Sequence, residues 1–190
     1  MLQVLLIGGV VCTSLSMAGS LVTQYKIGYW LGATPRRARR LQRDVIVDTA
    51  DGALVSRGCA LRVRDDDGHA YLTYKGAVVP GPLKVREELE TSAASAERLL
   101  AILAALGYRP VFRYEKYREE LAVPGALIAI DDTPIGTFLE LEGQEDAIHD
   151  WAARLGFSPA DYVTASYRSL WIAAAGDGTR GDMIFGAGRP

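Results

Sequence analysis

The sequence predicts an α+β fold in which antiparallel strands are packed against a few helices. Several stretches alternate apolar and charged residues with period two, which is typical of strands with one buried face. Other stretches repeat apolar residues at helical spacing and end at a helix-stop motif. The chain has 190 residues, of which 49% are hydrophobic and 23% charged, as in an ordinary globular domain.

The helices are indicated by a motif, Leu-Gly-x-x-Pro, that begins at Leu31, Leu106 and Leu155. Glycine just after a helix and proline shortly beyond it form a stop signal. The second copy ends a predicted helix that begins at Ser95, and the third ends one that begins at Glu145. The first copy indicates a further helix before it, although residues 14–30 are poor helix formers.

The strands are predicted between these helices. Residues 61–64 read LRVR, and the same alternation recurs at 83–90 and 138–142. The sequence DDDG at 65–68 is a hairpin turn signal, so neighbouring strands should be antiparallel. Hairpins together with a few helices indicate the α+β class.

The start of the chain is unusual because no Asp or Glu precedes Asp44. Residues 1–11 are apolar, but no basic residue precedes them as in a signal peptide, and Gly8 and Gly9 interrupt them well short of a membrane span. A buried strand or an N-terminal extension is therefore favoured over a secretion signal. We expect a cytoplasmic protein with no membrane partner.

The remaining composition excludes several kinds of site. Two cysteines and two histidines are isolated from one another, which argues against zinc and against a Ser-His-Asp triad. A net charge of −2 does not favour nucleic-acid binding. Residues 173–190 are rich in glycine and predict a disordered tail, which leaves one domain over 1–172 with an atypical start at 1–30.

The charged strand faces allow two interpretations. They face water, as in many antiparallel sheets, or they meet inside a closed sheet. Buried cations would then need a polyanionic ligand, and carboxylates beside them would suit magnesium, which together are the parts of phosphoryl transfer. The chain has no Walker loop and no G-x-G-x-x-G motif. The basic set is Arg62, Arg64, Lys75, Lys84, Arg86, Lys116 and Arg118, and the acidic set includes Glu88, Glu90, Glu140 and Glu142.

An ordered series of short motifs resembles the CYTH domain, the family of class IV adenylyl cyclases and of thiamine and inorganic triphosphatases. The resemblance covers about Leu31 to Trp171, and its strength lies in the order of the motifs. They are VDTADGAL at 47–54, LRVR at 61–64, YLTYKG at 71–76, REELE at 86–90, RYEKYR at 113–118, IDD at 130–132, FLELEG at 138–143 and ASYR at 165–168.

The resemblance implies an eight-stranded antiparallel β tunnel with helices packed outside. Basic residues in the tunnel would bind a triphosphate, and acidic residues would bind Mg²⁺ or Mn²⁺. By position, the triphosphate ligands would be Arg62, Arg64, Lys75, Arg86, Lys116 and Arg118. The metal ligands would be Glu140, Glu142 and Asp131, and Lys75, Glu88 and Glu90 would be catalytic.

The chain departs from the family at its first strand, which normally reads E-x-E-x-K. The corresponding positions would be Gln3, Leu5 and Ile7, while a later register over 22–26 keeps only Lys26. In either register the two metal-binding glutamates are missing. Either the metal site is weakened or the present N-terminus is not the ancestral one.

The resemblance implies an enzyme of the class IV adenylyl cyclase type, in which the 3′ hydroxyl of ATP attacks the α-phosphorus and pyrophosphate leaves. Two alternatives remain open. One is a triphosphatase that hydrolyses the γ-phosphate, and the other is a triphosphate-binding domain without catalysis, because the first acidic pair is missing. The expected partner is ATP or another triphosphate, in a monomer or homodimer.

Overall fold

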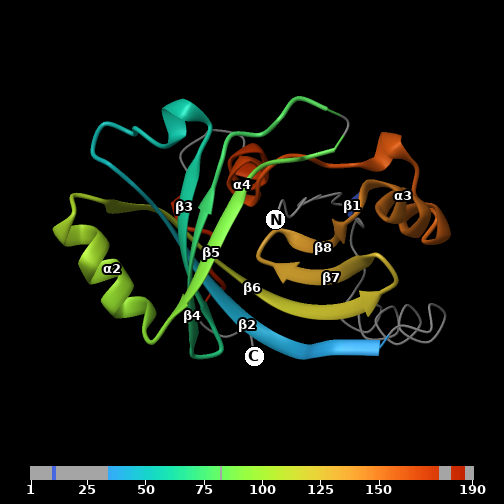
Figure 1. Cartoon of the computed structure of the whole chain (residues 1–190), viewed down its shortest axis with the longest axis horizontal. Helices are drawn as coiled ribbons and strands as arrows, with labels where there is room; N and C mark the ends of the chain where they lie inside the picture. The colour runs from blue at the N-terminus through green and yellow to red at the C-terminus, as the bar shows by residue number, and fades with distance from the viewer. Residues whose placement is uncertain (1–9, 12–33, 82, 176–180, 187–190) are drawn as a thin grey trace.

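The computed structural model describes residues 10–11, 34–81, 83–175 and 181–186. Their strands form one curved antiparallel sheet in the order β1-β8-β7-β6-β2-β3-β4-β5 (Figure 1). The strands are β1 (Val10–Val11), β2 (Thr34–Asp48), β3 (Ala60–Asp66), β4 (His69–Lys75), β5 (Glu88–Ala93), β6 (Arg109–Val123), β7 (Ala126–Thr133) and β8 (Gly136–Gly143). The predicted antiparallel sheet with helices is thereby confirmed.

The predicted closed tunnel of eight strands is not confirmed. Seven strands have six residues or more, whereas β1 has only two and pairs with β8 alone. At the other edge β5 pairs with β4. Within the described ranges no backbone pairing joins β1 to β5, so the sheet curves without closing.

The central pair of the sheet is β2 with β6, each 15 residues long. The sequence reading missed β2 as a strand, because its inward positions are polar. Gln42 and Asp44 are each 1% exposed, whereas Arg43 between them is exposed. Strands are usually recognised by apolar side chains at their buried positions, whereas these buried positions of β2 are polar. The predicted first strand near residues 3–7 and the predicted helix over 14–30 lie outside the described residues.

The described helices are α2 (Ala96–Ala105), α3 (Glu145–Arg154) and α4 (Tyr167–Ala175), with short 3₁₀ turns η1 (Val55–Arg57) and η2 (Pro159–Asp161). The predictions of α2 and α3 are confirmed. Gly107 and Gly156 follow them with φ of 91° and 88°, as the stop motif requires. α4 was not predicted. None of the helices in these ranges is long and apolar enough to cross a membrane.

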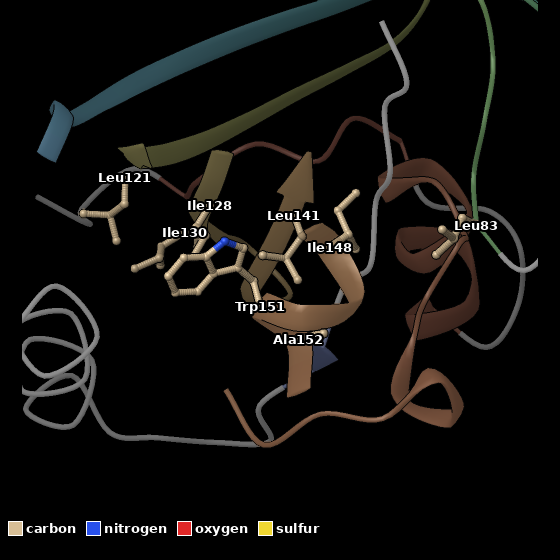
Figure 2. Close-up of a cluster of buried hydrophobic side chains, with 8 residues drawn as sticks. All are labelled: Leu83, Leu121, Ile128, Ile130, Leu141, Ile148, Trp151 and Ala152. Carbon is tan, nitrogen blue, oxygen red and sulfur yellow. The ribbon is translucent and has the colours of Figure 1, made fainter. Parts of the chain in front are cut away.

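Two of the described helices, α2 and α3, cover the outer, apolar face of the sheet. One core cluster joins α3 to β6, β7 and β8 through Ile128, Leu141, Ile148 and Trp151, among others (Figure 2). A second cluster, around Val47, Val63 and Leu103, packs α2 on the strands at the other end of the sheet. With this face covered by apolar packing, the polar inner face is left to form a site.

Part of the predicted disordered tail is ordered. α4 extends to Ala175, and residues 181–186 lie against β6. The Met183 amide donates to the Arg113 carbonyl at 2.8 Å, the Glu115 amide donates to the Met183 carbonyl at 2.9 Å, and the Met183 side chain is fully buried. Glycine-rich composition misled the prediction here, because one apolar residue within it fills a core position. Residues 176–180 and 187–190 lie outside the described residues.

Candidate active site

The inner face of the sheet lines a cavity of about 600 Å³. All of the sequence-predicted triphosphate ligands line it, and so do the four predicted glutamates of the site. The alternative in which these charged faces point to water is therefore wrong. These residues are Arg62, Arg64, Lys75, Arg86, Lys116 and Arg118, with Glu88, Glu90, Glu140 and Glu142.

Six cations in the described part of the chain are buried on the wall of this cavity. Burial of a charge is costly unless a partner of opposite charge compensates for it. The positions of the carboxylates therefore decide how the site is built. The six cations are Arg62, Arg64, Lys75, Lys84, Lys116 and Arg118.

Asp44 on β2 holds the arginines of β3. Arg64 donates to both oxygens of Asp44, through Nε at 2.8 Å and Nη2 at 3.1 Å, and Arg62 Nε lies 3.4 Å from Oδ1. Burial alone would raise the pKa of Asp44, but Arg64 and Arg62 hold it below its ordinary value. Sequence reasoning missed Asp44, although it lies directly opposite Arg64 in the β2–β3 register.

Asp131 on β7 holds the two cations of β6. Lys116 Nζ donates to Asp131 at 2.7 Å, Arg118 donates to both oxygens at 2.6 Å, and the Tyr167 hydroxyl donates at 2.7 Å. Burial would raise the pKa of Asp131, yet Arg118 and Lys116 keep it far below its ordinary value. These four hydrogen bonds occupy both carboxylate oxygens. The structure therefore lends no support to the predicted role of Asp131 as a metal ligand.

A third group of charges joins β4 and β5. Glu88 accepts hydrogen bonds from Lys75 at 2.7 Å and from Arg86 at 3.2 Å. Burial, with the nearby charge of Arg62, lowers the pKa of Lys75 to about 7 despite the attraction of Glu88. The predicted catalytic residue Glu90 is more exposed, and it accepts a hydrogen bond from the Thr73 hydroxyl at 2.7 Å.

Lys84 differs from the other buried cations because it has no hydrogen bond or ion pair with any described residue. It is 6% exposed and lines the cavity. Burial and the charge of Arg86 lower its pKa. Arg62 adds a buried Nε that lacks a hydrogen bond. An anion in the cavity would satisfy both groups.

Glu140 and Glu142 lie on the same side of β8 and line the cavity. Glu140 accepts a hydrogen bond from Arg118, whose Nη1 lies 3.7 Å from Glu142. Burial and the neighbouring Glu140 raise the pKa of Glu142, so a further positive charge would be favourable there. Among the described residues no three His, Cys, Asp or Glu side chains converge as a metal site. Two carboxylates nevertheless fit magnesium, which commonly completes its shell with phosphate oxygens and water.

The cavity also holds residues that the sequence reading did not single out. Arg40 on β2 donates to Asp66 at 2.6 Å and lies 3.0 Å from Glu120. Tyr167, at the start of α4, closes over Lys116, whose Nζ lies 5.2 Å from its ring centre. Only the pairing of distant strands reveals such groups, although the ASYR motif already included Tyr167.

The comparisons with known proteins decide the family. The family model described as the CYTH domain matches residues 32–167, well over half of the chain. The chain belongs to the CYTH family.

A curated CYTH relative from Methanocaldococcus jannaschii, named provisionally as an adenylate cyclase, is 34% identical to this chain over 105 residues. The match covers 55% of this chain and 60% of the relative. The chain therefore spans well under the full length of that relative.

Solved structures share the CYTH fold over most of their length. A provisionally named adenylate cyclase from Vibrio parahaemolyticus has a TM-score of 0.73 at 17% identity, covering 90% of this chain and 99% of its own. The PH1012 protein of Pyrococcus horikoshii has a TM-score of 0.68 at 20% identity, covering 85% and 96%. HpAC1 from Hippeastrum, described as having a dominant triphosphatase activity, has a TM-score of 0.66 at 17% identity, covering 90% and 96%.

Proposed function

We propose that the chain binds the triphosphate group of ATP or another triphosphate in this cavity and catalyses a metal-dependent reaction at phosphorus. One observation carries the proposal. The described residues place six buried cations around a single cavity, and one of them, Lys84, forms no hydrogen bond or ion pair with any of these residues. A chain of phosphates supplies several negative charges in a row, which matches such a wall.

The proposed roles follow from the contacts. Arg62, Lys84 and Arg86 would bind phosphate oxygens, since each of them lines the cavity. None of the three is paired with a carboxylate that accepts as many hydrogen bonds as Asp131 does. Glu140 and Glu142 would hold Mg²⁺ or Mn²⁺. When bound, the metal would withdraw negative charge from phosphate oxygens.

Lys75 would act as a general base. A lysine whose pKa is near 7 is partly neutral at physiological pH, and a neutral amine can accept a proton from an attacking hydroxyl group. Glu88, 2.7 Å from its nitrogen, would then hold the resulting ammonium group in place.

The first candidate reaction is that of an adenylyl cyclase, in which the 3′ hydroxyl of ATP attacks the α-phosphorus and pyrophosphate leaves. The name of the Methanocaldococcus relative favours it. The second candidate is hydrolysis of the terminal phosphate, which the description of HpAC1 favours.

The reaction is tested by incubating the chain with ATP and either Mg²⁺ or Mn²⁺ and separating the products. Cyclic AMP with pyrophosphate identifies a cyclase, and ADP with phosphate identifies a triphosphatase. Tight binding without metal and without turnover would contradict the catalytic proposal and leave a binding domain. This third outcome has a specific reason to be considered: no carboxylate precedes Asp44, so the first acidic pair of the family is missing.

Lys84→Met is the sharpest test of the binding site. We expect tripolyphosphate affinity to fall about tenfold or more, because a charge-assisted contact is lost. The melting temperature of the ligand-free protein should rise, because the variant removes a buried cation that forms no ion pair with any described residue. Calorimetric titration and thermal melts measure both effects.

The matched control is Arg43→Met, which removes an exposed cation from the side of β2 that faces away from the cavity. It should change neither the affinity nor the melting temperature appreciably. Unchanged tripolyphosphate affinity in Lys84→Met would contradict the proposed site.

A further inference from the structure

One edge of β6 is covered only in part by β7, and the end of the chain covers more of it. β7 pairs with residues 117–123 of β6, and in the part of the chain that the structure describes no other named strand pairs with this edge. Met183 forms a parallel bridge to Tyr114 there, while Tyr114 pairs with Asp44 of β2 on the opposite edge. We call residues 181–186 the C-terminal segment. It lies beyond the match to the CYTH model, which ends at residue 167.

Hydrogen bonds hold the C-terminal segment on β6 and on α4. The Met183 amide donates to the Arg113 carbonyl at 2.8 Å, and the Arg113 amide donates to the side chain of Asp182 at 2.8 Å. The indole of Trp171 on α4 donates to the Gly181 carbonyl at 2.8 Å. The segment is thus tied to a strand and to a helix that both carry residues of the cavity wall.

Met183 packs behind aromatic residues of that wall. Its fully buried side chain contacts Phe112 and Tyr114, and both of these line the cavity. The ring centre of Tyr114 lies 5.9 Å from that of Tyr167, which also lines the cavity. Because protein interiors are closely packed, the Met183 side chain fixes the position of the rings in front of it. A smaller side chain there would leave a space into which the rings could move.

The two tyrosines contact the carboxylates that hold the buried cations. The Tyr167 hydroxyl donates to Asp131 at 2.7 Å, and its ring covers Lys116. Tyr114 is the register partner of Asp44, and burial together with the charge of Asp44 raises the pKa of Tyr114. The C-terminal segment is therefore connected, through two neighbouring rings, to both carboxylates on which the arrangement of the cations depends.

We propose that Met183 is a positioning residue of the triphosphate site, and that docking of the C-terminal segment on β6 is coupled to binding of the triphosphate. The docked segment holds Tyr114 and Tyr167 against the ion pairs of the cavity wall. This inference rests on the proposed function and adds to it a means of regulating the same site. Coupling between two binding events is reciprocal, so the ligand must strengthen docking by the same factor by which docking strengthens ligand binding.

The first test is calorimetric titration of the full chain carrying Met183→Ala with tripolyphosphate. We expect the affinity to fall about fivefold or more, the lower end of common coupling factors, because the two tyrosines lose the side chain behind them. Met183→Leu nearly conserves the volume and should restore the affinity. Thermal melts define a temperature at which every variant is folded, and the titrations are carried out there.

The matched control is Ile148→Ala. Ile148 is a fully buried residue of α3, and no residue of its core cluster lines the cavity. The substitution should lower the stability about as much as Met183→Ala does, since both remove a large buried side chain. It should leave the tripolyphosphate affinity unchanged, so the comparison separates positioning from a general loss of stability.

The second test is hydrogen exchange in the unmodified chain. The amides of Met183 and Glu115 are bonded between the C-terminal segment and β6, so their exchange reports detachment of the segment. Saturating tripolyphosphate should slow their exchange about fivefold or more. The amide of Leu106, at the end of α2 and bonded to the Ile102 carbonyl, is the local reference and should exchange at an unchanged rate.

The outcomes distinguish this inference from the proposed function. Unchanged tripolyphosphate affinity in Met183→Ala, or an equal loss in Ile148→Ala, would overturn the inference and leave the triphosphate site standing. Exchange at Met183 and Glu115 that does not respond to bound tripolyphosphate would overturn it in the same way, even if Met183→Ala did not fold. If tripolyphosphate does not bind the unmodified chain, the proposed function and the inference both fail.

Discussion

Asp131 allows Lys116 and Arg118 to remain charged inside the sheet. Both cations are at most 4% exposed, and both donate hydrogen bonds to this one carboxylate. An ion pair of this kind does little for net stability, but removal of one partner leaves the others buried without compensation. The residue therefore has a structural role in the site, whatever binds in the cavity.

Asp131→Asn should destabilise the protein by about 3 kcal/mol, because the buried Lys116 loses its ion pair and Arg118 keeps only its contacts with Glu140 and Glu142. The folded-state pKa of Asp131 lies below its unfolded value, so its contribution to stability is present above about pH 4 and is lost as the pH falls further. Denaturant unfolding at pH 7 and at pH 3 measures both effects. Asp132→Asn is the control. Its carboxylate forms an exposed pair with Arg39, so it should cost less than about 1 kcal/mol, and an equal cost would contradict the assignment.

Lys75 should set the pH dependence of catalysis. Its pKa of about 7 predicts that kcat/KM rises as the pH increases through 7, since the neutral amine is the base. Lys75→Arg should remove this rise, because arginine stays protonated. The same lowered pKa makes the free energy of unfolding rise as the pH increases from about 7 to 10, because the unfolded chain binds the additional proton in that range.

The control for this pH profile is the double variant His69→Gln with His149→Gln, which removes both histidines of the chain. Neither histidine lines the cavity. A rise near pH 7 that disappeared with the histidines and persisted in Lys75→Arg would contradict the role of Lys75.

At the scale of elements, the strands and helices with ordinary patterning were predictable from sequence. The helices α2 and α3 have apolar stripes and end at glycine and proline, so their local signals agree with the fold. β2 was not recognised, because its inward residues are polar and contact other polar residues across the cavity. The segment at 181–186 was missed because its place depends on β6, which is about 70 residues away in sequence.

Met183→Ala tests whether this segment is part of the core. The Met183 side chain is fully buried against Phe112 and Tyr114, so we expect a loss of about 2–4 kcal/mol in the free energy of unfolding. Ile184→Ala is the matched control. Its side chain is 52% exposed, and it should cost less than about 1 kcal/mol. Equal effects in denaturant unfolding would show that the segment does not hold the core.

At the scale of the whole molecule, the sequence predicted most of the charged residues that line the cavity but not how their charges are paired. Alternation alone fits strands that face water as well as strands that face a cavity, and the order of the motifs favoured the cavity. The pairing of Asp44 with Arg64 and of Asp131 with Arg118 depends on strand register. Register is a property of the assembled sheet, so no single motif contains it.

The solitary Lys84 has a consequence for the lifetime of the protein. A buried cation that forms no ion pair with any described residue lowers the stability of the empty form, and the polyanion proposed above would shift the equilibrium toward the folded state. Proteases act mainly on molecules that have opened. Depletion of the proposed polyanion would therefore speed the degradation of this protein, and its abundance would follow the supply of that ligand.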